Sequence, residues 1–157
     1  MMKSKAKISV RISNFYCDVL IIGSGSAGLR AAIEAKDRGA QVIIVSKSKS
    51  NDPHTVLARG GINAALGTMD PEDSWIVRAA DTLREGEFLA DYKKVETLCQ
   101  NAPDAINELP EWGYVFIEPD RRLTRRYFGA HTYRRTYFYG DEIGKEIIRI
   151  LIEHDLD

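Results

Sequence analysis

Three glycines near the start of the chain, at positions 23, 25 and 28, have a spacing that lets backbone approach a phosphate. They lie between an expected buried strand at about 16–22 and an expected helix at 26–38. The first glycine permits the turn, the second lets backbone approach a pyrophosphate, and the third lets the helix pack on the strand. The helix would aim unpaired N–H groups and its positive dipole end at the phosphates. The candidate phosphate-binding residues are Gly23, Ser24, Gly25, Ser26, Ala27 and Gly28.

A second buried strand is expected at 41–46, after Gly39 ends the helix in the left-handed conformation. Together these segments predict a βαβ unit with a right-handed crossover, and hence an α/β fold of Rossmann type. An acidic residue usually follows the second strand and binds ribose hydroxyls. Here Ser46 and Lys47 stand in its place. The pair fits either the 2′-phosphate of NADP or an FAD site in which hydroxyl and backbone groups hold the ribose.

The segment 46–67 is long, polar and contains glycine. A loop of this length inside a compact domain is usually functional or disordered. Gly60 and Gly61 indicate backbone that lies close against a flat ligand. The alternative interpretation is a mobile surface loop.

Helical periodicity dominates the middle of the chain. Asp70 is the expected cap and Pro71 the first residue of a helix that ends near Glu85. A second helix is expected from about Asp91, and a proline divides it from a third at 103–111. Apolar residues recur at helical spacing and predict core positions rather than cofactor contacts. These residues are Trp75, Ile76, Leu83, Val95, Leu98, Ile106 and Leu109.

The last third of the chain predicts a strand at 114–117, a turn at 118–120 and then a basic, aromatic segment at 121–139 without any acid. Most arginines of that segment are expected to be exposed, with their stems packed on tyrosines. Its composition leaves nucleic-acid binding open as a separate class, which loss of DNA affinity on mutating Arg125 and Arg126 would support. A final amphipathic helix is expected from Asp141. Its apolar positions are Ile143, Ile147, Ile148, Leu151 and Ile152.

The composition is that of an ordinary globular chain. At 157 residues, with a net charge of −1 and 44% hydrophobic residues, one domain is expected, without a global reason for nucleic-acid or acidic-membrane binding. Cys17 and Cys99 are too far apart in sequence for a CxxC pair, so neither a disulfide framework nor a metal site is expected. A reducing cytoplasm fits this cysteine usage. No signal peptide or membrane-spanning run is expected, and residues 1–13 are expected to form a loose extension.

Read in order, several motifs of this sequence resemble the N-terminal part of one flavoprotein family. That family holds succinate dehydrogenase, fumarate reductase and L-aspartate oxidase. The resemblance covers nearly the whole chain from Asp18 onward, and the combination is very specific. It rests on the glycine fingerprint, Ser46-Lys47, His54-Thr55-Val56, Gly60-Gly61-Ile62, Trp75, Asp81-Thr82, Ala102-Pro103, Trp112-Gly113, Phe128-Gly129, His131, Asp141 and Gly144.

The resemblance implies a Rossmann-like FAD-binding domain that is incomplete, with helical and β-hairpin insertions. Residues 14–157 would be its N-terminal part, and the capping and C-terminal domains would be absent. The implied cofactor is FAD rather than NADP, with the loop from His54 to Gly61 along the flavin. His54 has the register of the histidine that carries flavin covalently in the succinate dehydrogenase branch, whereas L-aspartate oxidases hold FAD non-covalently. The further cofactor-binding candidates are therefore Ser46, Lys47, His54, Thr55, Ala58, Arg59, Gly60 and Gly61.

The activity implied by the family is hydride transfer between a C4 dicarboxylate and flavin N5. The alternatives are an L-aspartate oxidase of NAD biosynthesis, and a truncated or split chain that is inactive alone. No catalytic residue is assigned, because the family's dicarboxylate-binding and proton-donating groups would lie beyond Asp157. Implied partners are a dicarboxylate substrate and either a chain that completes the fold or an iron–sulfur subunit. The protein would be cytoplasmic, or peripheral to the membrane within a respiratory complex.

His131 has two interpretations. Family members often have Gln or His at the corresponding place near the dicarboxylate site, and the alternative is a histidine hydrogen-bonded within a loop. Some positions depart from the family pattern and weaken the expectation of an intact site. Arg59 replaces a Gln, Pro53 a Ser, Arg78 a His, and Ile143 a Thr.

Overall fold

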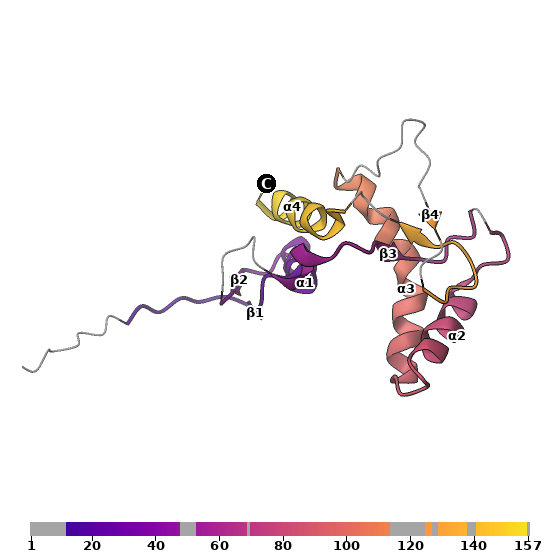
Figure 1. Cartoon of the computed structure of the whole chain (residues 1–157). Helices are drawn as coiled ribbons and strands as arrows, with labels where there is room; N and C mark the ends of the chain where they lie inside the picture. The colour runs from indigo at the N-terminus through magenta and orange to yellow at the C-terminus, as the bar shows by residue number, and fades with distance from the viewer. Residues whose placement is uncertain are drawn as a thin grey trace, which may run out of the picture.

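The computed structural model describes residues 12–47, 53–68, 70–113, 125–126, 129–137 and 141–156. The expected strand at 114–117, the turn at 118–120 and much of the basic segment lie outside these residues. Four α-helices, one short 3₁₀ helix and five strands are assigned within the described part of the chain. Figure 1 shows α1 beside α4 at one end of the molecule and the α2–α3 pair at the other.

The N-terminal βαβ unit is confirmed. Strand β1 (Val19–Ile22), helix α1 (Ser26–Asp37) and strand β2 (Val42–Val45) follow one another as expected, although both strands are shorter than predicted. The strands pair in parallel, with Val19 opposite Val42 and Ile22 opposite Val45. The end of α1 is closed by Gly39 at φ +83°, whose N–H donates to the Lys36 carbonyl while that of Ala40 donates to Ala35. This pair of bonds is the Schellman arrangement that glycine favours.

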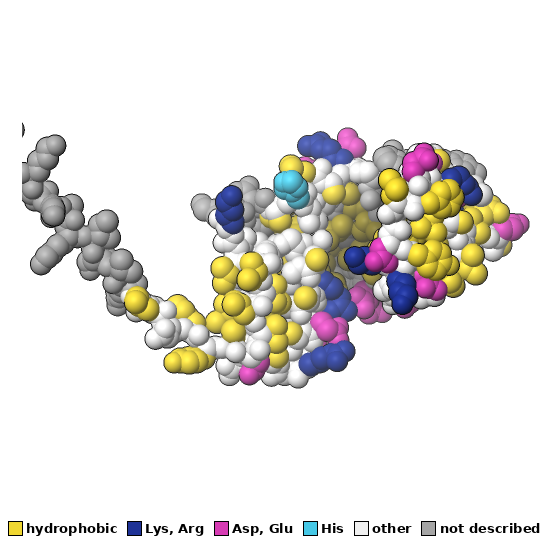
Figure 2. All heavy atoms as spheres, turned by 90° about the horizontal axis from the view of Figure 1, so that it is seen from below, with side chains coloured by type: hydrophobic (Ala, Val, Ile, Leu, Met, Phe, Trp, Pro, Cys, Tyr) yellow, Lys and Arg dark blue, Asp and Glu magenta, His cyan; other side chains and the backbone are white. Residues whose placement is uncertain are grey.

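The expectation that β1 is a buried strand is wrong. Leu20 and Val45 are more than half exposed, and Ile22 is 85% exposed. Helix α1 packs against both strands, but no described element covers the opposite face of this two-stranded sheet. Hydrophobic side chains are correspondingly visible on that lobe in Figure 2. The sequence shows that these strands are apolar. Whether an apolar strand is buried depends on which helices or strands pack against its two faces.

A second sheet lies between the two helical regions. Strand β3 (Ile62–Asn63) pairs antiparallel with β5 (Thr136–Tyr137), which pairs antiparallel with β4 (Arg125–Arg126). The sheet joins the 46–67 loop to the basic segment, which are more than 60 residues apart in sequence. Thr136 and Tyr137 are both about 1% exposed, so this short central strand is part of the core.

Helix α2 (Trp75–Glu85) begins later than predicted. Its cap is Ser74, whose hydroxyl accepts a hydrogen bond from the N–H of Val77, and not Asp70. The Asp70 carboxylate instead accepts from Arg134, and Pro71 stands in a turn before the helix. The predicted end near Glu85 is confirmed, with Gly86 as the C-cap. The prediction of Asp70 as the helix cap is wrong because its carboxylate pairs with Arg134, a residue distant in sequence.

Replacing Ser74 with alanine is expected to lower the free energy of unfolding by about 1 kcal/mol, because the Val77 N–H loses its acceptor. Urea unfolding followed by circular dichroism measures the change. Thr97→Ala is the matched control, since Thr97 is exposed inside a helix and its hydroxyl only donates to the Lys93 carbonyl. If both variants lose equal stability, Ser74 is not the cap.

Helix α3 (Tyr92–Glu111) is continuous, so the predicted division at Pro103 is wrong. Proline removes one backbone donor and disfavours a helix interior, yet tertiary packing on both sides of Pro103 holds the helix together. Ala102, Ile106 and Leu109 belong to one buried cluster, and Val95 and Cys99 belong to another with Ala79 of α2.

The predicted core positions are confirmed in part. Val95, Ile106 and Leu109 are buried, and Trp75 and Leu83 are partly buried against Ala79, Val95 and Cys99. Ile76 and Leu98 are 61% and 57% exposed, so their prediction as core is wrong. Helices α2 and α3 each bury one face. Helical periodicity alone assigned Ile76 and Leu98 to those faces, although both side chains lie outside them.

The last helix, α4 (Ile143–Leu156), forms where the sequence predicts it. It packs on α1 and on the 3₁₀ helix η1 (His54–Leu57). Ile148 and Leu151 of α4 meet Leu29 and Ile33 of α1 in a buried cluster, with Val56 of η1 at its margin. The C-terminal helix therefore holds the N-terminal helix and the loop that follows β2 in one unit.

Candidate functional site

The turn after β1 has the geometry that the glycine spacing predicts. Gly23 has φ +114°, a conformation that favours glycine, and its N–H donates to the Val45 carbonyl at 2.8 Å. A Cβ atom on Gly28 would lie only 2.0 Å from the Gly23 carbonyl oxygen. Glycine at 28 therefore permits the close contact between helix and turn, as the sequence predicted.

The beginning of α1 is free to receive an anionic group. Its cap is Gly25, which has no side chain to accept from the first turn. The Ser26 N–H lies 3.3 Å from the Thr55 hydroxyl, and the Ser26 and Thr55 hydroxyls are also 3.3 Å apart. The other N–H groups of this first turn and the helix dipole fit a pyrophosphate. The donors present here therefore match the phosphate part of a dinucleotide.

The end of β2 reaches the same turn. The Ser24 hydroxyl donates to the Ser46 hydroxyl at 2.9 Å, which joins the two strand ends side by side. Lys47 follows as an exposed residue. The structure thus brings the candidates of the first turn and the second strand end together at the carboxyl edge of the sheet, where nucleotides bind in such folds.

Of the cofactor-binding candidates in the loop after β2, some lie against the start of α1 and others are exposed to solvent. Thr55 lies against Ser26, while His54, Ala58 and Arg59 are exposed along and after η1. The Ala58 carbonyl accepts from the N–H of Gly144 at 3.1 Å, which ties this loop to the start of α4. Residues 55 and 58 of this loop are therefore held by hydrogen bonds to the starts of α1 and α4.

Gly61 lies against strand β5. It has φ +103°, and a Cβ atom there would lie 2.6 Å from both the Thr136 Cγ2 and the Tyr137 carbonyl oxygen. The sequence interpretation attributed Gly60 and Gly61 to a flat ligand. Packing against β5 already requires glycine at position 61, so that requirement is no evidence of a ligand.

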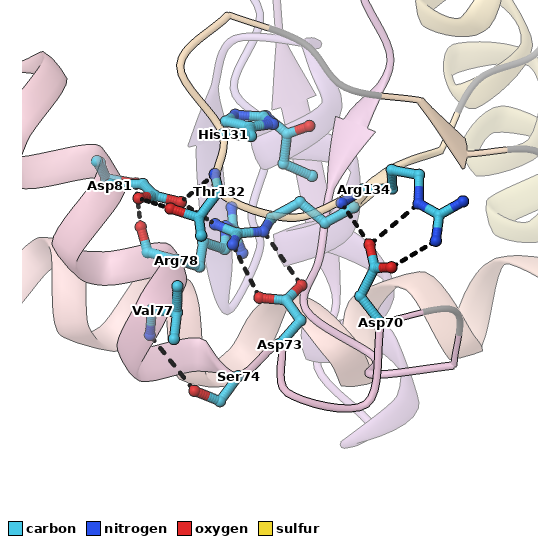
Figure 3. A network of polar contacts seen from close by, with 12 residues as sticks. Asp70, Asp73, Ser74, Val77, Arg78, Asp81, His131, Thr132 and Arg134 are labelled. Atoms are coloured by element: carbon cyan, nitrogen blue, oxygen red, sulfur yellow. Dashed lines mark hydrogen bonds and ion pairs between the residues drawn. The ribbon is translucent and has the colours of Figure 1, made fainter.

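A buried polar network lies beside β5 and was not predicted (Figure 3). Arg135 is 1% exposed and donates through Nε and Nη2 to Asp73 at 3.1 and 2.8 Å, and through Nη1 to Asp81 at 2.9 Å. Asp81 also accepts from the N–H and hydroxyl of Thr132 at 2.9 and 2.7 Å. The expectation of exposed arginines is therefore wrong for Arg135, because two distant carboxylates compensate its burial.

The pKa values of the two carboxylates in this network are shifted in opposite directions. Burial raises the pKa of Asp73, and the charge of Arg135 offsets this only in part. Burial also acts to raise the pKa of Asp81, but the hydrogen bonds from Thr132 and the charge of Arg135 outweigh it and lower that pKa. No sequence signal marked this pairing, since its members are separated by more than 50 residues.

His131 is a hydrogen-bonded loop histidine in this structure, which matches one of its two interpretations. Its Nε2 lies 3.4 Å from the Asn63 Nδ2 of β3. Burial, followed by the charge of Arg135, lowers the pKa of His131, so the neutral imidazole is favoured near neutral pH.

Among the described residues, no group of three or more His, Cys, Asp or Glu side chains could hold a metal ion. Within the same part of the chain, no helix is long and apolar enough to cross a membrane. Cys17 and Cys99 are both free thiols.

Comparison with known proteins gives consistent matches. The family model described as an FAD binding domain matches residues 18–156. One subunit of the fumarate reductase (CoM/CoB) of Methanothermobacter marburgensis is 47% identical over 141 residues, covering 88% of this chain and 26% of the relative. The succinate dehydrogenase flavoprotein subunit of Coxiella burnetii is 37% identical over 158 residues, covering 95% and 26%.

Solved structures similar to this chain come from proteins with related names. A chain of the Mycobacterium smegmatis Sdh1 complex in the apo form has a TM-score of 0.83 and 45% identity, covering 88% of this chain and 23% of that one. A chain of a quinol–fumarate reductase with menaquinol molecules has a TM-score of 0.81 and 30% identity, with 92% and 25% covered. The chain thus spans about a quarter of the length of the relatives it matches.

Proposed function

Because the chain belongs to the FAD-binding domain family of succinate dehydrogenase and fumarate reductase flavoproteins, we propose that it forms the N-terminal FAD-binding part of a flavin-dependent dicarboxylate oxidoreductase. One observation supports this most directly. The uncapped start of α1 and the end of β2 meet at the glycine turn, with Thr55 held against Ser26. This arrangement offers backbone donors for a pyrophosphate and a neighbouring loop for the rest of the cofactor.

Each candidate residue has a proposed role toward FAD. Residues 23–28 would hold the pyrophosphate, Ser46 and Lys47 the ribose, and residues 54–61 the flavin ring. When bound, FAD supplies hydride exchange between its N5 and a C4 dicarboxylate. The described residues hold and orient the cofactor, and none of them is assigned a catalytic role.

The substrate and partners extend this proposal beyond the chain. We propose succinate or fumarate as the dicarboxylate, because the similar proteins in Methanothermobacter and Coxiella are named for these reactions. The partner would be a polypeptide segment that completes the FAD domain, or an iron–sulfur protein of the same complex. The exposed apolar face of the β1–β2 sheet supports such an association, since exposed apolar patches commonly mark interfaces. The proposed location is the cytoplasm or the membrane periphery.

An L-aspartate oxidase type of flavoprotein is the second candidate, and His54 separates the two. The exposed His54 lies in η1, one residue before Thr55. In the succinate dehydrogenase type this histidine would carry FAD covalently, whereas an L-aspartate oxidase would hold it non-covalently.

Purified chain is expected to be yellow and to retain flavin fluorescence after acid denaturation, and His54→Ala is expected to lose that retained fluorescence. Absorbance near the flavin band measures total cofactor, and fluorescence of the acid-precipitated protein measures the covalent part. His154→Ala is the matched control, because it removes an exposed histidine of α4 that stacks on Trp112. Flavin that washes out of wild type in acid would favour the oxidase type, and purified chain without any flavin would favour a chain that needs a further segment.

A further inference from the structure

Arg30, in the first half of α1, joins this helix to the end of α3. Its Nε and Nη2 donate to the two carboxylate oxygens of Glu108, each at 3.3 Å, and its Nη1 donates to Glu34 at 3.0 Å. The guanidinium also lies over the Trp112 ring, with Cζ 5.3 Å from the ring centroid, where a cation is attracted to the indole face. A carboxylate held through two N–H groups of one guanidinium fixes direction as well as distance. Arg30 therefore holds one side of α1 at a set position relative to α3.

Trp112 lies where the two larger apolar clusters meet. It is the C-cap residue of α3, and it packs, partly buried, against the cluster around β5 and the cluster between α1 and α4. His154 of α4 stacks on its ring, with the centroids 4.8 Å apart and the planes at 19°. Helix α4 contributes isoleucines to both clusters, so apolar packing also joins the two regions. Such packing is non-directional, and the pair of Arg30 with Glu108 adds the direction that it lacks.

The proposed FAD site extends from the region of α1 to the region of α3 (Figure 1). The phosphate and ribose candidates lie at the glycine turn and at the end of β2, beside α1. The candidate loop for the flavin ring ends at Gly61 against β5, and Tyr137 of β5 packs in one cluster with Ile106 and Leu109 of α3. A ligand that contacts both regions binds only those molecules in which the separation between the regions is right. Its apparent affinity is lowered by that fraction.

We propose that Arg30 is a positioning residue for FAD, which holds α1 to Glu108 and Trp112 and so keeps the phosphate-binding turn at the separation from β5 that a whole FAD molecule requires. This inference rests on the proposed function. ADP, which is one half of FAD, would contact only the glycine turn and the end of β2, so its binding does not depend on that separation. The side chains of Arg30 and Glu108 are 37% and 38% exposed. Breaking their pair therefore leaves no buried charge and changes the global stability little.

Titration of the whole chain with FAD and with ADP separates positioning from local damage to the turn. His54→Ala is the parent chain, because a flavin that is not attached to His54 can be removed and added back. Adding Arg30→Met is expected to weaken FAD binding about three- to tenfold, the range of an exposed ion pair with a cation–π contact, and to leave ADP binding unchanged. Flavin fluorescence measures the first affinity and titration calorimetry the second. Arg38→Met is the matched control, expected to change neither affinity, since Arg38 pairs with Glu34 of the same helix and is 78% exposed.

A second variant removes the same contact from α3. Glu108→Ala is expected to weaken FAD binding as Arg30→Met does, and the double variant is expected to bind FAD no more weakly than either single variant, because residues that act as one pair are not additive. Unchanged FAD binding in both single variants would overturn the proposal. Equal losses of FAD and ADP binding would also overturn it, because the damage would then lie at the glycine turn itself. A parent chain that binds neither nucleotide would overturn the proposed function, and this inference with it.

Discussion

Replacing Gly144 with alanine is expected to abolish stable flavin binding and to lower the free energy of unfolding by about 1–3 kcal/mol or more. A Cβ atom on Gly144 would lie 1.8 Å from the Thr55 carbonyl oxygen, 2.9 Å from the Thr55 carbonyl carbon and 3.0 Å from the Ala58 Cβ. The obstacle is mainly backbone, so a side-chain rotation cannot relieve it. Either α4 or η1 must move, and the Gly144–Ala58 hydrogen bond is lost with that movement.

The effect reaches the proposed FAD site through Thr55. Its hydroxyl contacts both the N–H and the hydroxyl of Ser26 at the start of α1, so a displaced η1 takes Thr55 away from the glycine turn. Flavin titration measures the loss of affinity, and urea unfolding measures the loss of stability. Gly86→Ala is the control, because Gly86 ends α2 at φ −80° and a Cβ there would come no closer than 3.3 Å to its neighbours. Unchanged flavin affinity in Gly144→Ala would show that α4 does not position this loop.

Replacing Arg135 with methionine is expected to lower the free energy of unfolding by about 3–5 kcal/mol, which would unfold a marginally stable chain. Methionine keeps much of the side-chain volume but leaves Asp73 buried without a guanidinium, and it leaves Asp81 with only the ion pair to the exposed Arg84. Both carboxylates are about 2% exposed, so water cannot replace the lost partner without opening the structure. Far-ultraviolet circular dichroism during urea unfolding measures the change.

The control for this prediction is Arg149, which pairs with two carboxylates as Arg135 does but lies on the surface. Arg149 of α4 pairs with Glu146 and Glu153, and its side chain is 45% exposed. Arg149→Met is expected to cost about 0–1 kcal/mol, because exposed ion pairs gain little over hydration. Equal losses in Arg149→Met and Arg135→Met would show that the number of ion pairs, and not burial, sets their contribution. Partial recovery on adding Asp73→Asn to Arg135→Met would confirm that the unpaired carboxylate causes the loss.

The sequence by itself determined the parts of this protein whose causes are local. Glycines at 23, 28 and 39 met specific backbone requirements, and the apolar runs and periodicity predicted the βαβ unit and α4. The family resemblance rested on the same short motifs and is confirmed by the FAD binding domain match over residues 18–156. These features depend on turn conformation and on side-chain spacing over a few residues. Both can be read from the amino-acid sequence.

Only the tertiary structure decided the partners of the polar residues. Asp70 was predicted as a helix cap and instead pairs with Arg134, Pro103 was predicted to end a helix that continues through it, and Arg135 was expected at the surface. In each case a contact from a distant segment outweighs a local preference of about 1–3 kcal/mol. Burial and pairing depend on which segments meet in space, and spacing along the chain does not contain that information.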